Sequence, residues 1–177
     1  WMIAVPIIGI GILGFMRDEE SIRRVAFGIT IVEFFLSLIL WRDFDLTLQS
    51  MQFVERMEWM PTFNIQYAVG VDGISILLVI LTALLCPLCI LCSWTGITTR
   101  VRAYLSLILL VESAMIVVFT ALDLFLFFML WELTMIPMYF MIILWGGPNR
   151  IAAGLKFLLY SLTGSLLLLV GILGIYI

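Results

Sequence analysis

Histidine is absent from this sequence of 177 residues, and charged side chains make up only 12% of it. Soluble domains carry about 25% charged and roughly 45–50% apolar residues, whereas 64% of this chain is hydrophobic. Without histidine there is no imidazole base or imidazole metal ligand, and no nucleotide-binding loop, flavin site or metal-ligand cluster is visible. The composition excludes a soluble enzyme with its own redox or catalytic centre, and it predicts an integral membrane protein.

Cysteine is also scarce, with three residues at Cys86, Cys89 and Cys92. Their C-x2-C-x2-C spacing is similar to part of an iron–sulfur ligand set, but a fourth thiolate is missing and the segment is apolar enough to lie in lipid. We interpret the cysteines as small side chains that pack on a helix, and we predict no cofactor and no metal site in this chain.

Neither end of the sequence has the features of a complete chain. The start, Trp-Met-Ile-Ala-Val-Pro, lacks the basic region and the small-residue cleavage site of a signal peptide. Because Trp1 opens the chain and Ile177 falls inside an apolar run, we expect a piece of a longer protein. No internal repeat or soluble domain is visible, so residues 1–177 are predicted to be a single membrane domain.

Long apolar runs predict an all-α fold, a polytopic transmembrane bundle of about six helices, each near the ~20 residues that a bilayer requires. The long connection, residues 42–73, is predicted to be a surface loop. Alternation of Phe63, Ile65, Tyr67, Val69 and Val71 predicts a short strand or hairpin within it, at the membrane surface. The predicted helices span residues 1–16, 25–41, 74–94, 103–122, 124–146 and 151–177.

Arginine is distributed unevenly between the connections. Six arginines fall on one side of the predicted membrane, whereas the other side holds Arg42 and Arg56 in its long loop. By the positive-inside rule, the arginine-rich side faces the cytoplasm or the mitochondrial matrix. The six are Arg17, Arg23, Arg24, Arg100, Arg102 and Arg150.

Carboxylates lie near the middle of the fourth and fifth predicted helices. Glu112 lies eleven residues before the turn at Asp123 and Glu132 nine residues after it, so both are roughly 13–17 Å from the same membrane surface. Ionisable side chains at such depth are costly and are typically functional. We therefore predict that the two carboxyls titrate as a coupled pair that accepts and releases protons.

Four further residues bear on this site. Lys156 is expected roughly 9–12 Å below the arginine-rich surface, either as a charge partner of Glu132 or with its stem extended to water. Pro137 withdraws a backbone hydrogen bond beside Glu132, which either admits water or merely kinks the helix. Glu33 is interpreted as a protonated acid that makes an interhelical hydrogen bond, and Asp72 as a turn or helix-start residue.

Several motifs together carry a resemblance. Val71-Asp-Gly-Ile-Ser75 is followed by the run Asp123-Leu-Phe-Leu-Phe-Phe-Met-Leu-Trp-Glu-Leu-Thr-Met-Ile-Pro-Met-Tyr139, and then by Trp145-Gly-Gly and Ala153-Gly-Leu-Lys-Phe157. These stretches resemble the antiporter-like membrane subunits of proton-pumping NADH:quinone oxidoreductase (respiratory complex I), of the chain M or subunit 4 type. The resemblance runs over nearly the whole chain and is densest from residue 71 to residue 160.

The resemblance implies a fold of fourteen helices with two inverted five-helix repeats, of which this chain holds the N-terminal third. It implies that Glu132 is the key glutamate of the family, that Lys156 matches a lysine common on the sixth helix, and that Glu112 occupies a position where acids are frequent. The seventh-helix lysine that pairs with the glutamate, the broken helix and the second repeat are not among these residues.

The first hypothesis is a proton-translocating subunit of NADH:quinone oxidoreductase in a bacterial plasma membrane or mitochondrial inner membrane. Glu132 would exchange a proton, with Lys156 and Glu112 as relay or tuning groups. The resemblance implies protons, lipid and neighbouring antiporter-like chains as partners, and no nucleic acid. It places NADH, FMN, iron–sulfur clusters and quinone in other subunits. The alternatives are a subunit of a cation/proton antiporter, hydrogenase or bicarbonate-uptake complex, and a structural subunit whose acids are merely hydrogen-bonded.

Overall fold

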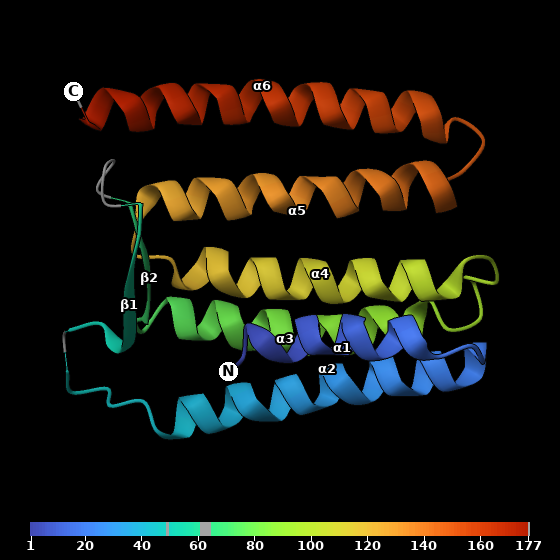
Figure 1. The fold of residues 1–177 in the computed structure, drawn as a ribbon, viewed down its shortest axis with the longest axis horizontal. Coiled ribbons are helices and arrows are strands. Elements are labelled where there is room, and N and C mark those ends of the chain that lie inside the picture. The colour runs from blue at the N-terminus through green and yellow to red at the C-terminus, as the bar shows by residue number, and fades with distance from the viewer. Residues whose placement is uncertain (49, 61–64, 177) are drawn as a thin grey trace.

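A computed structural model of the chain describes residues 1–48, 50–60 and 65–176. Within these ranges, six helices run side by side between two ends of the molecule, and a β-hairpin lies across one of the ends (Figure 1). We call this the hairpin end and the opposite one the arginine end. The elements are α1 (Ala4–Phe15), α2 (Glu19–Arg42), β1 (Gln52–Met60), β2 (Ile65–Val71), α3 (Ser75–Cys92), α4 (Val101–Thr120), α5 (Leu124–Trp145) and α6 (Arg150–Tyr176).

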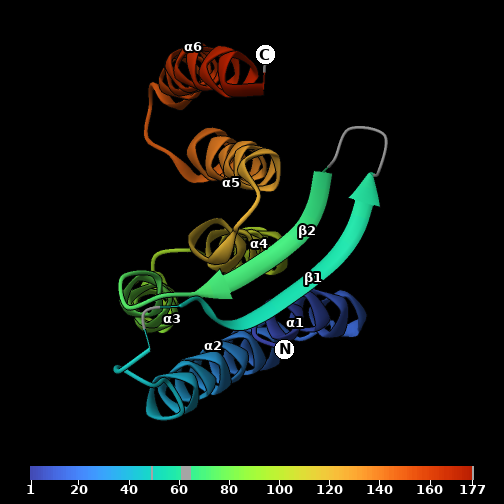
Figure 2. The same cartoon turned by 90° about the vertical axis from the view of Figure 1, so that its left-hand side faces the viewer.

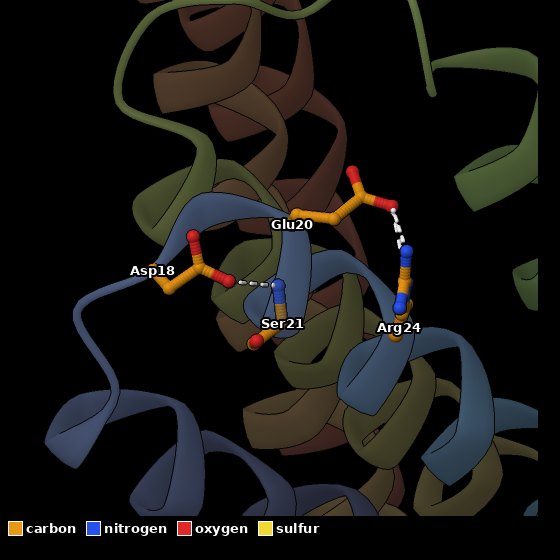
Figure 3. A network of polar contacts seen from close by, with 4 residues as sticks. All are labelled: Asp18, Glu20, Ser21 and Arg24. Carbon is orange, nitrogen blue, oxygen red and sulfur yellow. Dashed lines mark hydrogen bonds and ion pairs between the residues drawn. The ribbon is translucent and has the colours of Figure 1, made fainter.

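The predicted transmembrane bundle is confirmed, since five of the described helices are long and apolar enough to cross a membrane. The largest boundary error is at α2, which begins at Glu19 rather than at residue 25. Asp18 caps this helix by accepting a hydrogen bond from the Ser21 amide at 2.8 Å, and Glu20 pairs with Arg24 one turn on (Figure 3). A charged first turn outside the apolar stretch was therefore mistaken for a loop.

The hairpin predicted in the long connection is also confirmed. β1 and β2 pair antiparallel, and Figure 2 shows them crossing the ends of the helices. β2 is the inner strand: its Ala68 carbonyl accepts a hydrogen bond from the Leu122 amide at 2.8 Å, between α4 and α5. A Cβ on Gly70 would come within 2.9 Å of Leu122, so glycine permits this close approach. Phe63, part of the predicted alternation, lies outside the described residues.

α4 is the central helix of the bundle. It packs against α1, α2, α3 and α5, whereas α6 packs on α5 as the outermost layer (Figure 2). The core between α1, α2, α3 and α4 is apolar at the arginine end and contains Leu13, Ile22, Ile90, Leu105 and Leu109, each no more than 2% exposed. Neighbouring helices therefore shield polar groups on α4 on most sides, whereas polar groups on α6 have a helix on one side only.

The arginine end is stabilised by hydrogen bonds from arginine to helix C-termini. The three helices that finish there, α1, α3 and α5, have carbonyl groups at or just beyond their last turns that accept hydrogen bonds from arginines of α4, α2 and α6, respectively. These carbonyls would otherwise lack partners, and a cation there also interacts favourably with the helix dipole. The pairs are Arg102 with Gly14 and Met16, Arg23 with Trp94 and Ile97, and Arg150 with Leu144.

Candidate functional site

α5 presents the sequence-predicted glutamate from a well-defined start. Asp123 Oδ1 accepts hydrogen bonds from the amides of Phe125 and Leu126, both at 2.9 Å, which confirms its predicted place at the turn. The helix then continues unbroken through Pro137 to Trp145. Pro137 is buried and leaves the Leu133 carbonyl without its usual intrahelical donor, but it does not interrupt the helix.

Glu132 faces the groove between α5 and α6. Its side chain lines a cavity of about 340 Å³ to which α6 contributes Leu158 and Leu162. Glu132 Oε1 is buried and has no hydrogen-bond partner. The other lining residues are apolar as well: Met129, Leu133, Met135 and Ile136.

Lys156 does not pair with Glu132 in this structure. It is exposed, and within the part of the chain that the structure describes it forms no ion pair. The α5-facing side of α6 is marked by Gly154, where a Cβ would come within 2.4 Å of Ile143. Lys156 follows Gly154 by two residues, which corresponds to a rotation of about 200° around the helix axis, so Lys156 points away from α5.

Glu112 lies on a different face of the bundle from Glu132. It is fully buried on α4, and its electrostatic neighbours are Glu33 on α2 and the Cys86 thiol on α3. Neither oxygen of Glu112 has a hydrogen-bond partner, and the same holds for Glu33. Glu112 therefore lies toward Glu33 rather than toward Glu132, and the interhelical hydrogen bond predicted for Glu33 is not formed among the described residues.

Three glutamates nevertheless share one level along the bundle. Glu33 lies nine residues before the end of α2, Glu112 eight before the end of α4, and Glu132 eight after the start of α5. At 1.5 Å per residue, each is about 12–14 Å from the hairpin end of its helix. By this count Glu33, Glu112 and Glu132 lie at similar distances from the hairpin ends of their helices, as expected for Glu112 and Glu132.

A polar stripe on α2 escaped the sequence analysis. Thr30, Glu33 and Ser37 are all fully buried and face the bundle interior. The two hydroxyls donate to backbone carbonyls of their own helix, Thr30 to Phe27 and Ser37 to Phe34. Their spacing of three and four residues is the signal that could have revealed one helical face.

The three cysteines do not converge on a common point. Cys86 is buried beside Glu112, whereas Cys89 and Cys92 are exposed on α3, and all three are free thiols. Within residues 1–48, 50–60 and 65–176, no group of three or more metal-ligating side chains is arranged to hold an ion.

Comparison with known proteins decides the family. The family model described as "NADH-ubiquinone oxidoreductase chain 4, amino terminus" matches residues 2–118. The chain belongs to this chain 4 family. A second model, "NADH:quinone oxidoreductase/Mrp antiporter, TM", matches residues 121–177, which include Glu132 and Lys156. Family membership and the five apolar helices make this a multi-pass membrane protein of the antiporter-like type found in complex I.

Individual chain 4 relatives support the same assignment. NADH-ubiquinone oxidoreductase chain 4 of Arabidopsis thaliana is 41% identical over 175 residues, covering 97% of this chain and 35% of the relative. NADH-quinone oxidoreductase subunit M of Rhodobacter capsulatus is 44% identical over 158 residues, covering 89% of this chain and 30% of the relative. A chain of respiratory complex I from Thermus thermophilus with bound NADH matches with a TM-score of 0.83 at 28% identity, covering 98% of this chain and 34% of that one. This chain spans about a third of the length of the relatives it matches.

Proposed function

We propose that the protein to which this chain belongs is a proton-translocating membrane-arm subunit of NADH:quinone oxidoreductase. Quinone reduction in other subunits would drive proton transfer through an intramembrane glutamate and lysine relay. Glu132 is the group that takes up and releases the proton. The proposal rests on family membership for the complex and on the geometry at Glu132 for the chemistry.

The observation that carries the relay is the unpartnered Glu132 Oε1 in an otherwise apolar cavity about 12 Å from the hairpin end of α5. No hydrogen-bond donor within the described residues stabilises a negative charge at this oxygen. A cation that moves near it would therefore stabilise that charge. A group with this sensitivity can load a proton in one state of the complex and release it in another.

Lys156 and Glu112 have different parts in this proposal. Lys156 is the sole lysine of the sequence. It is directed away from Glu132, so it would pass charge toward further helices of the full-length protein rather than act as a fixed ion-pair partner. Glu112 is on the neighbouring helix at the same level and would tune the energy of a negative charge at Glu132 through their mutual repulsion.

Expected partners follow from the same assignment. They are the lipid bilayer and the adjacent antiporter-like chains of the complex. NADH, FMN, iron–sulfur clusters and quinone are expected to bind to other subunits, with no cofactor in this chain. A second function, cation/proton exchange in an antiporter complex, is favoured by the family model that matches residues 121–177, because its description covers Mrp antiporters as well.

Proton pumping during NADH oxidation by membrane vesicles tests the proposal, with Glu132→Gln in the full-length chain. The amide keeps the size of the side chain but cannot ionise. Pumping and coupled turnover are expected to fall at least tenfold while the assembled complex remains present on native gels. Glu58→Gln is the matched control, since Glu58 is exposed on β1 and undergoes the same chemical change.

Unchanged pumping in the Glu132→Gln vesicles would show that this glutamate is structural. Sodium-dependent proton exchange without any NADH-driven pumping would instead select the antiporter reading. In either case the Glu58→Gln vesicles must behave as the parent ones for the comparison to hold.

A further inference from the structure

Glu33 and Glu112 are buried with few of the polar contacts that buried carboxyls normally require. Both side chains are 0% exposed, and all four of their oxygen atoms lack hydrogen-bond partners. A buried polar group without a hydrogen-bond partner destabilises the fold, and the cost is larger when the group is charged. Two such groups at a similar level on the packed helices α2 and α4 therefore call for a functional explanation.

A cavity approaches this pair from the hairpin end. It has a volume of about 280 Å³ and lies beneath the β-hairpin, between α2, α3 and α4. Leu36 and Ile116 are among its lining residues, and they are three and four residues beyond Glu33 and Glu112 on the same helices. The cavity thus comes within about one helical turn, roughly 4.5–6 Å, of the two carboxyls.

The lining of this cavity includes a few polar side chains, those of Asp43, Glu55 and Thr120, and most of its other lining residues are apolar. The apolar turn between the cavity and the carboxyls would keep bulk water out but allow a transient water chain to form. Such a separation is what a proton site needs if it is to exchange with one side of a membrane only.

The charged and titratable groups around the pair come from few elements. α3 contributes the Cys86 thiol, which lies beside Glu112. The described residues of α1, Ala4–Phe15, contain no ionisable side chain, and Glu132 of α5 lines the groove with α6 instead.

We propose that Glu33 and Glu112 form a proton-binding site of their own, loaded from the hairpin end through the cavity beneath β1 and β2. One proton moves from a hydronium ion in the cavity to a carboxylate oxygen, leaving water and a carboxylic acid. The acid O–H then donates to the carboxylate of the other glutamate, which lies at a similar level on a packed helix, so this hydrogen bond forms only in the protonated state. Release reverses these steps.

This site is distinct from Glu132, which faces the other side of α5. Its physiological role rests on the proposed function, because it would add a second proton store at the same depth. Whether the site binds a proton does not depend on the proposed function, so proton binding and physiological role can be tested separately. The test must therefore report on carboxyl protonation as well as on pumping.

Infrared difference spectroscopy of the purified complex measures the carbonyl stretch of protonated carboxyls during a pH titration. A titrating band that shifts in D2O is expected in the parent complex. Glu33→Gln and Glu112→Gln are each expected to abolish it, because the amide cannot share the proton. Glu132→Gln is expected to abolish pumping and leave this band in place.

A band that survives both pair variants would overturn the proposal, even if Glu132→Gln confirms the proposed function. Loss of the band on addition of sodium ions at constant pH would also overturn the proposal, since the site would then bind a metal cation. Should Glu33→Gln fail to assemble, Glu33→Asp keeps a carboxyl that is one methylene shorter. The proposal predicts that its band persists with a shifted midpoint, and an unshifted midpoint contradicts it.

Access can be tested on the same complex. Ile116→Phe adds bulk to the cavity lining one turn from Glu112 without touching either carboxyl's chemistry. Hydrogen–deuterium exchange of the carboxyl band is expected to slow at least severalfold in this variant. Exchange at the parent rate would show that the proton reaches the pair by another route, and it would remove the cavity from the proposal.

Discussion

Arg23 of α2 donates a hydrogen bond from Nη1 to the Trp94 carbonyl at 2.7 Å, across 71 residues of sequence. Its second nitrogen, Nη2, donates to the Ile97 carbonyl, and the side chain is only 9% exposed. Arg23 therefore caps the C-terminal end of α3. It is also one of the six arginines from which the orientation of the chain in the membrane is predicted. Its neighbour Arg24 is exposed and pairs with Glu20 on its own helix.

Substitution of these two neighbouring arginines should separate the roles of charge and hydrogen bonding. Arg23→Gln is expected to destabilise the protein by about 2–3 kcal/mol, because two carbonyls lose a charged donor. Arg24→Gln removes the same charge but only an exposed ion pair, with an expected cost below about 0.5 kcal/mol. Thermal denaturation of the detergent-solubilised complex measures both. Equal effects of the two substitutions would mean that stability depends on the loss of the positive charge and not on the hydrogen bonds that Arg23 donates to α3.

Gly154 sets the distance between α5 and α6. A Cβ at this position would come within 2.4 Å of Ile143 and 3.4 Å of Tyr139. Gly154→Ala is expected to cost about 1–3 kcal/mol through overpacking and to disturb the Glu132 cavity. The matched control is Gly164→Ala on the same helix, where nothing among the described residues lies within 4 Å. That change should be neutral or slightly stabilising, since alanine is the better helix former. If both variants melt at the parent temperature, α6 does not pack on α5 as the structure shows.

Asp72 makes the first turn of α3 sensitive to acid. Its Oδ1 accepts from the Ser75 amide at 2.7 Å and from the Ile74 amide at 3.1 Å. The hydrogen bonds from the Ser75 backbone and side chain lower the pKa of Asp72 below its ordinary value of 3.8. A lowered pKa stabilises the fold above that ordinary value, and the contribution is lost as the pH falls through the folded-state pKa.

Amide-exchange protection of residues 73–76 as a function of pH measures this contribution. Asp72→Asn should keep protection near the parent level at neutral pH, because asparagine also caps helices, and should remove the acid-dependent loss. Asp72→Ala is expected to cost about 1 kcal/mol at neutral pH. An acid-dependent loss that persists in Asp72→Asn would assign it to another carboxyl.

Much of this architecture could be predicted because it depends on local properties of the chain. Apolar runs determined the number of helices, the alternation in residues 65–71 determined the hairpin, and Asp123 determined the turn into α5. The start of α2 was missed because the Asp18 cap and the Glu20–Arg24 pair extend a helix beyond its apolar stretch. Hydropathy does not register such polar turns.

The sequence by itself determined that this is a membrane protein of the chain 4 family, and it determined the depth of each glutamate, because the helix rise is constant along the chain. Only the tertiary structure decided which way each side chain faces. Glu112 meets Glu33 from a helix 79 positions earlier in the sequence, while Lys156 turns away from Glu132. The physical reason is that depth follows from counting residues, whereas rotation about the helix axis is set by packing between helices that are distant in sequence.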